Sequence, residues 1–188
     1  MSIARAFTWK TRTPTIIALA RSCGKWKKCA TASIVSHATA RPSSDPATAV
    51  LQDQAKRWMD EEAANYELVT SQIVLAEAAR GDPDAAGRRL AMLSDIPVLD
   101  ENPDADTVAD ALISRSLMPE SARLDAMHVA MAALAGVQYL LTQNCTHIAN
   151  AHVLPGVYRL LDELGLPGLL IATPFEFLGG DSDDKPDS

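Results

Sequence analysis

RLDAMHVAMAALAGVQYLLTQN, residues 123–144, predicts a buried helix that leads directly into a buried strand. The helix is apolar almost all the way round and ends at Gly136, and the strand ends in polar residues. Asp125 and His128 are the polar exceptions within the helix. A buried carboxylate is costly unless it is paired, hydrogen-bonded or bound to a metal. The stretch therefore raises the question of what Asp125 contacts.

The same alternation of helix and strand continues on both sides of this stretch. Further helices are predicted from Asp45, Ser71, Asp82 and Asn102 onward and within residues 152–166, and further short strands in YELVTS (66–71), IPVL (96–99) and GLLIATP (168–174). Strands that alternate with helices of this length are typical of an α/β domain with a mostly parallel sheet. In such sheets, ligands bind beyond the carboxyl ends of the strands.

The composition is ordinary for one soluble globular domain, with 47% hydrophobic and 22% charged residues among 188. The chain has three cysteines without C-x-x-C spacing, which argues against a disulfide framework or a zinc ribbon. A reducing, cytoplasmic location is therefore expected. There is no run of 18 apolar residues, so no membrane span is expected either.

The two ends of the chain differ from its middle. Residues 1–30 contain seven Lys and Arg residues and no acid, and 179–188 read GGDSDDKPDS. We expect 1–32 to be an atypical basic segment outside the domain, 33–179 to be the domain, and 180–188 to be a disordered acidic tail. An organellar transit peptide, a shifted reading frame, a wrong start and an added segment are alternative origins of the first segment.

Four polar side chains interrupt the apolar elements in a pattern that suggests one site. Glu77 lies in the nearly apolar IVLAEAA, as Asp125 does in its own helix, and Asn144 follows the strand that contains YLL. Thr142 lies two residues before Asn144, on the same side of an extended chain. Two carboxylates and an amide oxygen form a plausible Mg²⁺ or Mn²⁺ site.

Each of these residues also has a structural interpretation. Glu77 could be a half-exposed helix residue, Asp125 could interact with a helix N-terminus, and Asn144 could be a turn residue. His128 is interpreted as a core histidine with a hydrogen bond near the site. A zinc site built from His147 and His152 is disfavoured, because no cysteine or glutamate lies at the required spacing.

Three segments resemble PIN-domain nucleases, specifically the VapC-type toxins of bacterial toxin–antitoxin pairs. They are DAMHVAMAALAGVQYLLTQNCTHIAN (125–150), VTSQIVLAEAARGDPDAAGRRL (69–90) and LLIATPFEFL (169–178), within a resemblance that covers roughly residues 33–179. The resemblance implies a PIN-like three-layer α/β/α fold with a mostly parallel central sheet, in which the N-terminal strand is atypical. It also implies that Glu77 and Asp125 bind Mg²⁺ or Mn²⁺, with Asn144 where many PIN domains have a further acid.

The activity implied by this resemblance is metal-assisted hydrolysis of RNA, with Glu77, Asp125 and Asn144 as catalytic residues and Thr142 as a supporting hydrogen-bond donor. Possible phosphate contacts are Arg80 and Arg123, with Arg88 and Arg89 as further candidates. The implied partners are an RNA substrate, a cognate antitoxin and a second copy of the chain. The Trp58–Met59 face is a possible dimer contact, although core packing would also explain these two residues.

The departure from the family pattern lies at the first strand. The family's first acid would fall near Thr31, and the preceding KWKKCATA (25–32) is neither apolar nor acidic. Burial of its lysines as a central strand would be costly, so we expect this segment to stay out of the domain. Two other classes of function stay open: an inactive PIN-like protein that only binds an antitoxin or partner peptide, and an unrelated metal-dependent phosphohydrolase.

Overall fold

In the computed structural model of the chain, the described residues are 26–30 and 32–178. Their strands form a four-stranded parallel sheet in the order β2-β1-β3-β4. The strands are β1 (Trp26–Ala30), β2 (Tyr66–Val69), β3 (Tyr139–Leu141) and β4 (Leu170–Ala172). The strands predicted in YELVTS, VQYLLTQN and GLLIATP are thus confirmed. The protein is an α/β domain built around a small parallel sheet.

The strand predicted in IPVL is reduced to a single parallel bridge between Val98 and Thr70. Thr70 donates to the carbonyl of Pro97 at 2.9 Å, and its own carbonyl accepts from Leu99 N–H at 2.7 Å. Pro97 has no N–H to donate, so it is poorly suited to an extended strand ladder. The prediction of a second full strand was therefore wrong, although the segment does lie alongside the edge of β2.

The boundary expected after residue 32 is corrected by β1. Trp26–Ala30 lies between β2 and β3 and pairs in parallel with both. The prediction relied on the polarity of the lysine side chains, whereas strand pairing uses backbone N–H and C=O groups that every residue here provides. Residues 1–25, Thr31 and the tail 180–188 lie outside the described residues.

Three helices, α3, α4 and α5, begin where local side-chain chemistry predicts. Asp45, Ser71 and Asp82 accept hydrogen bonds from the backbone N–H three residues later, at 2.8, 3.3 and 2.9 Å. The α-helices of the described residues are α2 (Ala32–Thr39), α3 (Pro46–Arg57), α4 (Gln72–Ala78), α5 (Pro83–Leu93), α6 (Ala105–Ser114), α7 (Arg123–Leu134), α8 (Leu154–Glu163) and α9 (Phe175–Leu178). Shorter helical turns are η1 (Trp58–Glu62), η2 (Ala63–Asn65) and η3 (Glu120–Ala122). Helices α2 and α9 were not predicted.

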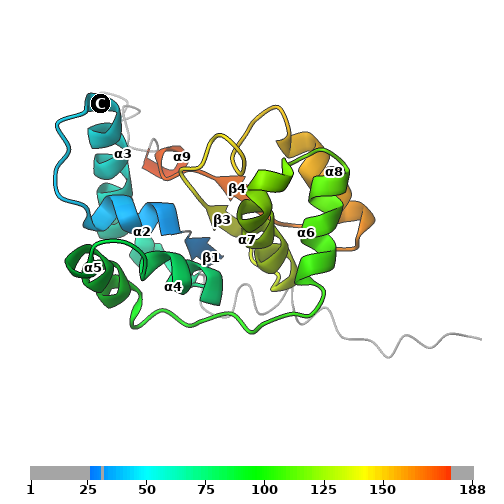
Figure 1. Ribbon diagram of the computed structural model, residues 1–188, viewed down its shortest axis with the longest axis horizontal. Coiled ribbons are helices and arrows are strands. Elements are labelled where there is room, and N and C mark those ends of the chain that lie inside the picture. Colours follow the sequence, from blue (N-terminus) through cyan, green and yellow to red (C-terminus); the bar gives the residue numbers. More distant parts are fainter. Residues whose placement is uncertain (1–25, 31, 179–188) are drawn as a thin grey trace, which may run out of the picture.

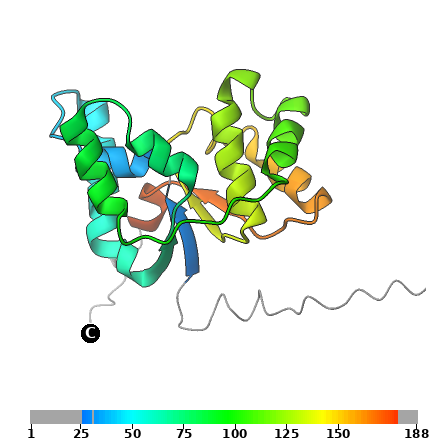
Figure 2. The same cartoon turned by 60° about the horizontal axis from the view of Figure 1, so that its bottom comes forward.

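The helices cover the sheet in two layers. Helices α2 to α5 lie on one side of the strands, and α6 to α8 lie on the other (Figure 1). The connection from α5 to α6 passes from the first layer to the second (Figure 2), and it includes the bridge of Val98 to β2. The chain runs from β1 to β2 on one side of β1 and later places β3 on the other side. Because crossovers between parallel strands are right-handed, the two connections put their helices on opposite faces of the sheet.

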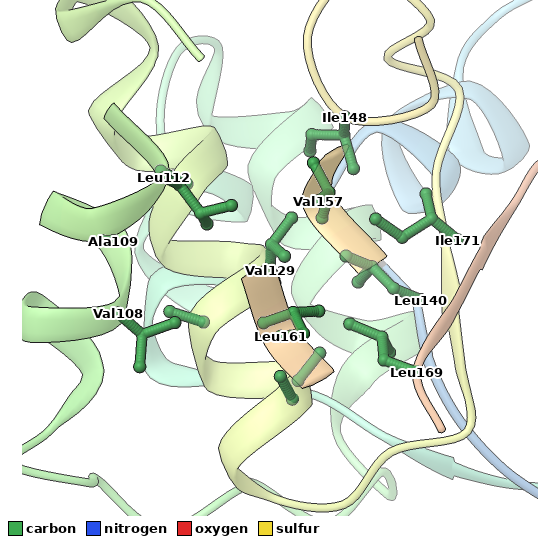
Figure 3. Packing of buried hydrophobic residues seen from close by; sticks show 14 of the residues in the cluster. Val108, Ala109, Leu112, Val129, Leu140, Ile148, Val157, Leu161, Leu169 and Ile171 are labelled. Carbon is green, nitrogen blue, oxygen red and sulfur yellow. The ribbon is translucent and has the colours of Figure 1, made fainter. Parts of the chain in front are cut away.

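Two hydrophobic layers confirm that both faces of the sheet are buried. Leu140 packs with residues of α6, α7, α8 and β4, including Leu112, Val129 and Leu161 (Figure 3). Leu141 points to the opposite face, where its cluster includes Ile34 of α2. Adjacent strand residues point to opposite faces, and both leucines are fully buried. The continuous apolar run in β3 is thus explained by burial on both sides.

Trp58 also belongs to the core. It is fully buried in the cluster that contains Ile34 and Leu141, and its ring stacks on Tyr66 with centroids 6.3 Å apart. Of the two interpretations of the Trp58–Met59 face, core packing is therefore correct for Trp58, which has no exposed surface to offer a partner. No helix in the part of the chain that the structure describes is long and apolar enough to cross a membrane.

Candidate functional site

The strand order identifies the edge where a ligand site is expected. From β1 the chain proceeds to β2 on one side, and it later returns to place β3 on the other side of β1. Ligands of open parallel sheets bind beyond the carboxyl ends of the strands at such a reversal. The carboxyl end of β3 is Leu141, followed by Thr142, Gln143 and Asn144. The residue after the carboxyl end of β1 is Thr31, which lies outside the described residues.

Glu77 of α4 reaches helix α7 of the opposite helical layer. Its Oε2 lies 3.0 Å from Nε2 of His128, although the two residues are 51 positions apart. The His128 side chain is 4% exposed and that of Glu77 is 23% exposed. His128 is thus a buried histidine with a hydrogen bond at the candidate site, as predicted. Glu77 is a partly buried carboxylate with its head group beside α7.

Asp125 lies one helical turn before His128 on α7. Residues three apart on a helix are neighbours on one face, so Asp125 and the Glu77–His128 pair share one side of α7. Asp125 is half-buried and lies in the first turn of the helix, which begins at Arg123 after the turn η3. A carboxylate there interacts favourably with the helix N-terminus. The structural interpretation of Asp125 is therefore supported, and it is compatible with a metal-binding role.

Thr142 and Asn144 hydrogen-bond locally after β3. The fully buried Thr142 Oγ1 accepts from Asn144 N–H at 3.0 Å, and Asn144 Oδ1 accepts from His147 N–H at 3.1 Å. Thr142 is an acceptor in this bond, and its hydroxyl hydrogen is left for the donor role predicted for it. Asn144 organises the turn after the strand, and its oxygen retains a second lone pair.

The donor chemistry fits a hard cation better than zinc. Among the described residues there is no group of three His, Cys, Asp or Glu side chains that could hold a metal ion. Mg²⁺ is commonly bound by only one or two carboxylates together with water and substrate phosphates, whereas structural Zn²⁺ needs four protein ligands. Glu77 and Asp125 could therefore serve as the carboxylates of a water-rich Mg²⁺ or Mn²⁺ site.

Most of the arginines considered for RNA contacts make structural contacts instead. Arg123 forms ion pairs with Asp110 and with Asp106, the latter at 2.6 Å, and these carboxylates hold the pKa of its guanidinium above the ordinary value. Arg89 donates to backbone carbonyls at the end of α4, at Ala78 and Arg80, and Arg88 donates to Thr39. Arg80 is exposed, and its side chain has no hydrogen-bond or ion-pair partner within the described part of the chain. Arg80 is therefore the freest of the four to contact phosphate.

Two further polar residues near the carboxyl edge were not predicted. His37, in the last turn of α2, hydrogen-bonds through Nδ1 to Gln143 Oε1, and Gln143 Nε2 donates to Leu51 O at 2.8 Å. These contacts tie α2 and α3 to the end of β3. The signal in the sequence was Gln143 itself. It lies between Thr142 and Asn144, and adjacent residues of an extended chain point to opposite sides, so its side chain points away from theirs.

Comparisons with known proteins do not assign the chain, because neither a family model nor a curated protein matches it. What the arrangement can do chemically therefore follows from its residues. Glu77 and His128 are in contact, Asp125 lies one turn away on α7, and Asn144 follows β3 at the carboxyl edge of the sheet.

Proposed function

We propose that the chain is a Mg²⁺- or Mn²⁺-dependent endoribonuclease with a PIN-like three-layer fold, acting as the toxin of a toxin–antitoxin pair. The observation that carries the proposal is the hydrogen bond between Glu77 and His128. This contact brings a carboxylate of one helical layer to the helix of the other layer that carries Asp125. Packing of the two helical layers does not by itself require a glutamate of α4 to contact α7. The contact lies at the carboxyl edge of the sheet, where ligands bind.

Each residue has a distinct role in the proposed reaction. Glu77 and Asp125 would hold the cation directly or through water, and His128 would orient the Glu77 carboxylate. A bound divalent cation activates water and offsets the charge that develops on the phosphate oxygens. Asn144 would supply a neutral oxygen beside the carboxylates, and Arg80 would contact a phosphate of the RNA.

The test is RNA cleavage by the full chain with Mn²⁺ or Mg²⁺ and with EDTA. Asp125→Asn should abolish metal-dependent cleavage and leave the melting temperature within a few degrees, because the substitution keeps the shape of a half-buried side chain. Asp84→Asn is the matched control, since Asp84 also lies in the first turn of a helix but is exposed on α5. Cleavage that persists in Asp125→Asn would refute the assignment, and unfolding of that variant would show that Asp125 is structural.

An inactive, partner-binding PIN-like protein is the second candidate. It is favoured by the lack of a third acidic or histidine ligand among the described residues, and by threonine at position 31. Thr31→Asp separates the two candidates. If the natural chain cleaves RNA, the first candidate holds. If only Thr31→Asp cleaves, the site is of the nuclease type and the natural chain is inactive, with an antitoxin or other peptide as its partner.

A further inference from the structure

A cavity of about 450 Å³ lies beside the candidate site, between the segment that follows α6 and the segment that follows β3. We name it the side pocket. Its apolar lining residues include Ile113, Leu117 and Val153, and its polar lining residues include Glu120, His147 and Asn150. A volume of this size is in the range of small-molecule pockets, and an apolar body with a few polar groups is their usual lining.

The side pocket adjoins the residues of the proposed nuclease site on both of its walls. His147 N–H donates to Asn144 Oδ1 at 3.1 Å, so one wall is attached to the turn after β3. Glu120 begins the turn η3, which leads directly into α7 and to Asp125. A molecule in the side pocket would therefore be held close to a substrate bound at the carboxyl edge.

The wall that carries Glu120 is built in a constrained conformation. Ser116 has a φ of 56°, in the left-handed region that residues other than glycine rarely adopt. The N–H groups of Leu117 and Met118 then both donate to the carbonyl of Leu112, at 3.0 and 3.3 Å. Met118 is also 1% exposed. The chain is thus turned sharply at the end of α6 and anchored to the core, which fixes the shape of the side pocket in advance.

Glu120 and His147 are the polar lining residues that offer a ligand a carboxylate and a ring. The structure gives neither the Glu120 carboxylate nor the His147 ring a hydrogen-bond or ion-pair partner among the described residues. Asn150, by contrast, already donates to Thr146 O at 2.9 Å and accepts from His152 N–H at 3.0 Å. The side pocket therefore offers a ligand one carboxylate, which accepts hydrogen bonds, and one flat ring, beside the hydroxyl groups of Ser116 and Thr146.

We infer that the side pocket binds an unpaired guanine of the RNA substrate, an inference that rests on the proposed nuclease function. Guanine has two adjacent donors, N1–H and the N2 amino group, on its Watson–Crick edge, and a carboxylate accepts both at once. Adenine and cytosine have only one amino group there, next to an acceptor nitrogen, and uracil has one N–H between two acceptors. Unpaired bases are recognised through this edge and by stacking on rings such as His147.

The first test is metal-free binding of the four nucleoside monophosphates to the full chain in EDTA, measured by calorimetry. GMP should bind about tenfold or more tightly than AMP, CMP or UMP, in line with the discrimination of a good bidentate contact. Glu120→Gln should remove this preference, because an amide cannot accept both hydrogen bonds. Glu101→Gln, at another exposed acid, should not change it. His147→Ala should weaken all four nucleotides by a similar factor, because it removes a stacking surface.

The second test is cleavage of an RNA with a single unpaired guanine, which separates this inference from the proposed function. Cleavage should map next to the guanine in the natural chain and lose that preference in Glu120→Gln. GMP-selective binding without any metal-dependent cleavage would support the side pocket and refute the nuclease. Cleavage without base preference, together with equal binding of all four nucleotides or none, would overturn the guanine site and leave the nuclease standing. A side pocket that binds only a partner peptide would also overturn it.

Discussion

A double-mutant cycle on Glu77 and His128 tests the contact on which the candidate site depends. The variants are Glu77→Ala, His128→Ala and the double variant. Each single substitution removes the hydrogen bond between α4 and α7, and the cycle isolates the pairwise free energy from the other consequences of truncation. His128→Ala should be the more destabilising single change, because it also leaves a cavity at a nearly buried side chain.

The expected coupling follows from burial and geometry. A hydrogen bond to a charged group contributes about 1.5–3 kcal/mol to stability. The Glu77 side chain is 23% exposed, and water already solvates part of it, so we expect a coupling free energy of about 1–2 kcal/mol. For a chain of this size, 1 kcal/mol corresponds to about 2–4 °C in Tm, so the coupling amounts to about 2–8 °C.

Urea unfolding followed by circular dichroism measures all four proteins on one scale. Glu101→Ala, at an exposed acid without a partner in the described part of the chain, is the control and should change stability by less than about 0.5 kcal/mol. A coupling free energy below about 0.5 kcal/mol would show that Glu77 and His128 do not interact in solution. The candidate site, which requires contact between α4 and α7, would then be refuted.

Three further substitutions test the fold around the site. Ser71→Ala should destabilise the protein by about 1 kcal/mol in urea unfolding, because Val74 N–H loses its capping acceptor at the start of α4; an unchanged midpoint would contradict this. Leu140→Ala should cost about 2–5 kcal/mol, since this leucine is fully buried among α6, α7 and α8, and a cost below 1 kcal/mol would mean that β3 is not central. Thr48 holds the pKa of Asp45 below its ordinary value through two hydrogen bonds. The stabilisation from Asp45 is therefore present above about pH 4 and lost as the pH falls through the lowered folded-state pKa, and Asp45→Asn should flatten the stability curve in that range.

Local features could be predicted because their causes lie within a few residues. Asp45, Ser71 and Asp82 cap the helices that follow them, since each side chain needs only the backbone N–H three positions later. The wrong prediction of a strand at residues 96–99 also has a local cause. Pro97 has no N–H for a strand ladder, and the segment forms a single parallel bridge instead.

The candidate site was predictable only as a set of polar exceptions. Glu77 and Asp125 stood out because apolar residues surround them in the sequence. That Glu77 contacts His128, rather than water, depends on α4 and α7 belonging to opposite layers that meet at the carboxyl edge. Gln143 points toward His37 because adjacent residues after β3 face opposite sides of the sheet.

The sequence by itself determined the alternation of helices and strands, the helix caps and the burial of Leu140, because periodicity and short-range hydrogen bonding control these features. The tertiary structure alone decided the position of Trp26–Ala30 between β2 and β3. The lysines of this segment indicated a position outside the domain. Strand pairing, however, depends on backbone groups, and the edges of β2 and β3 that face β1 need a strand to pair with. The same applies to the side pocket, whose walls come from two segments that only the packing of α6 and α7 against β3 brings together.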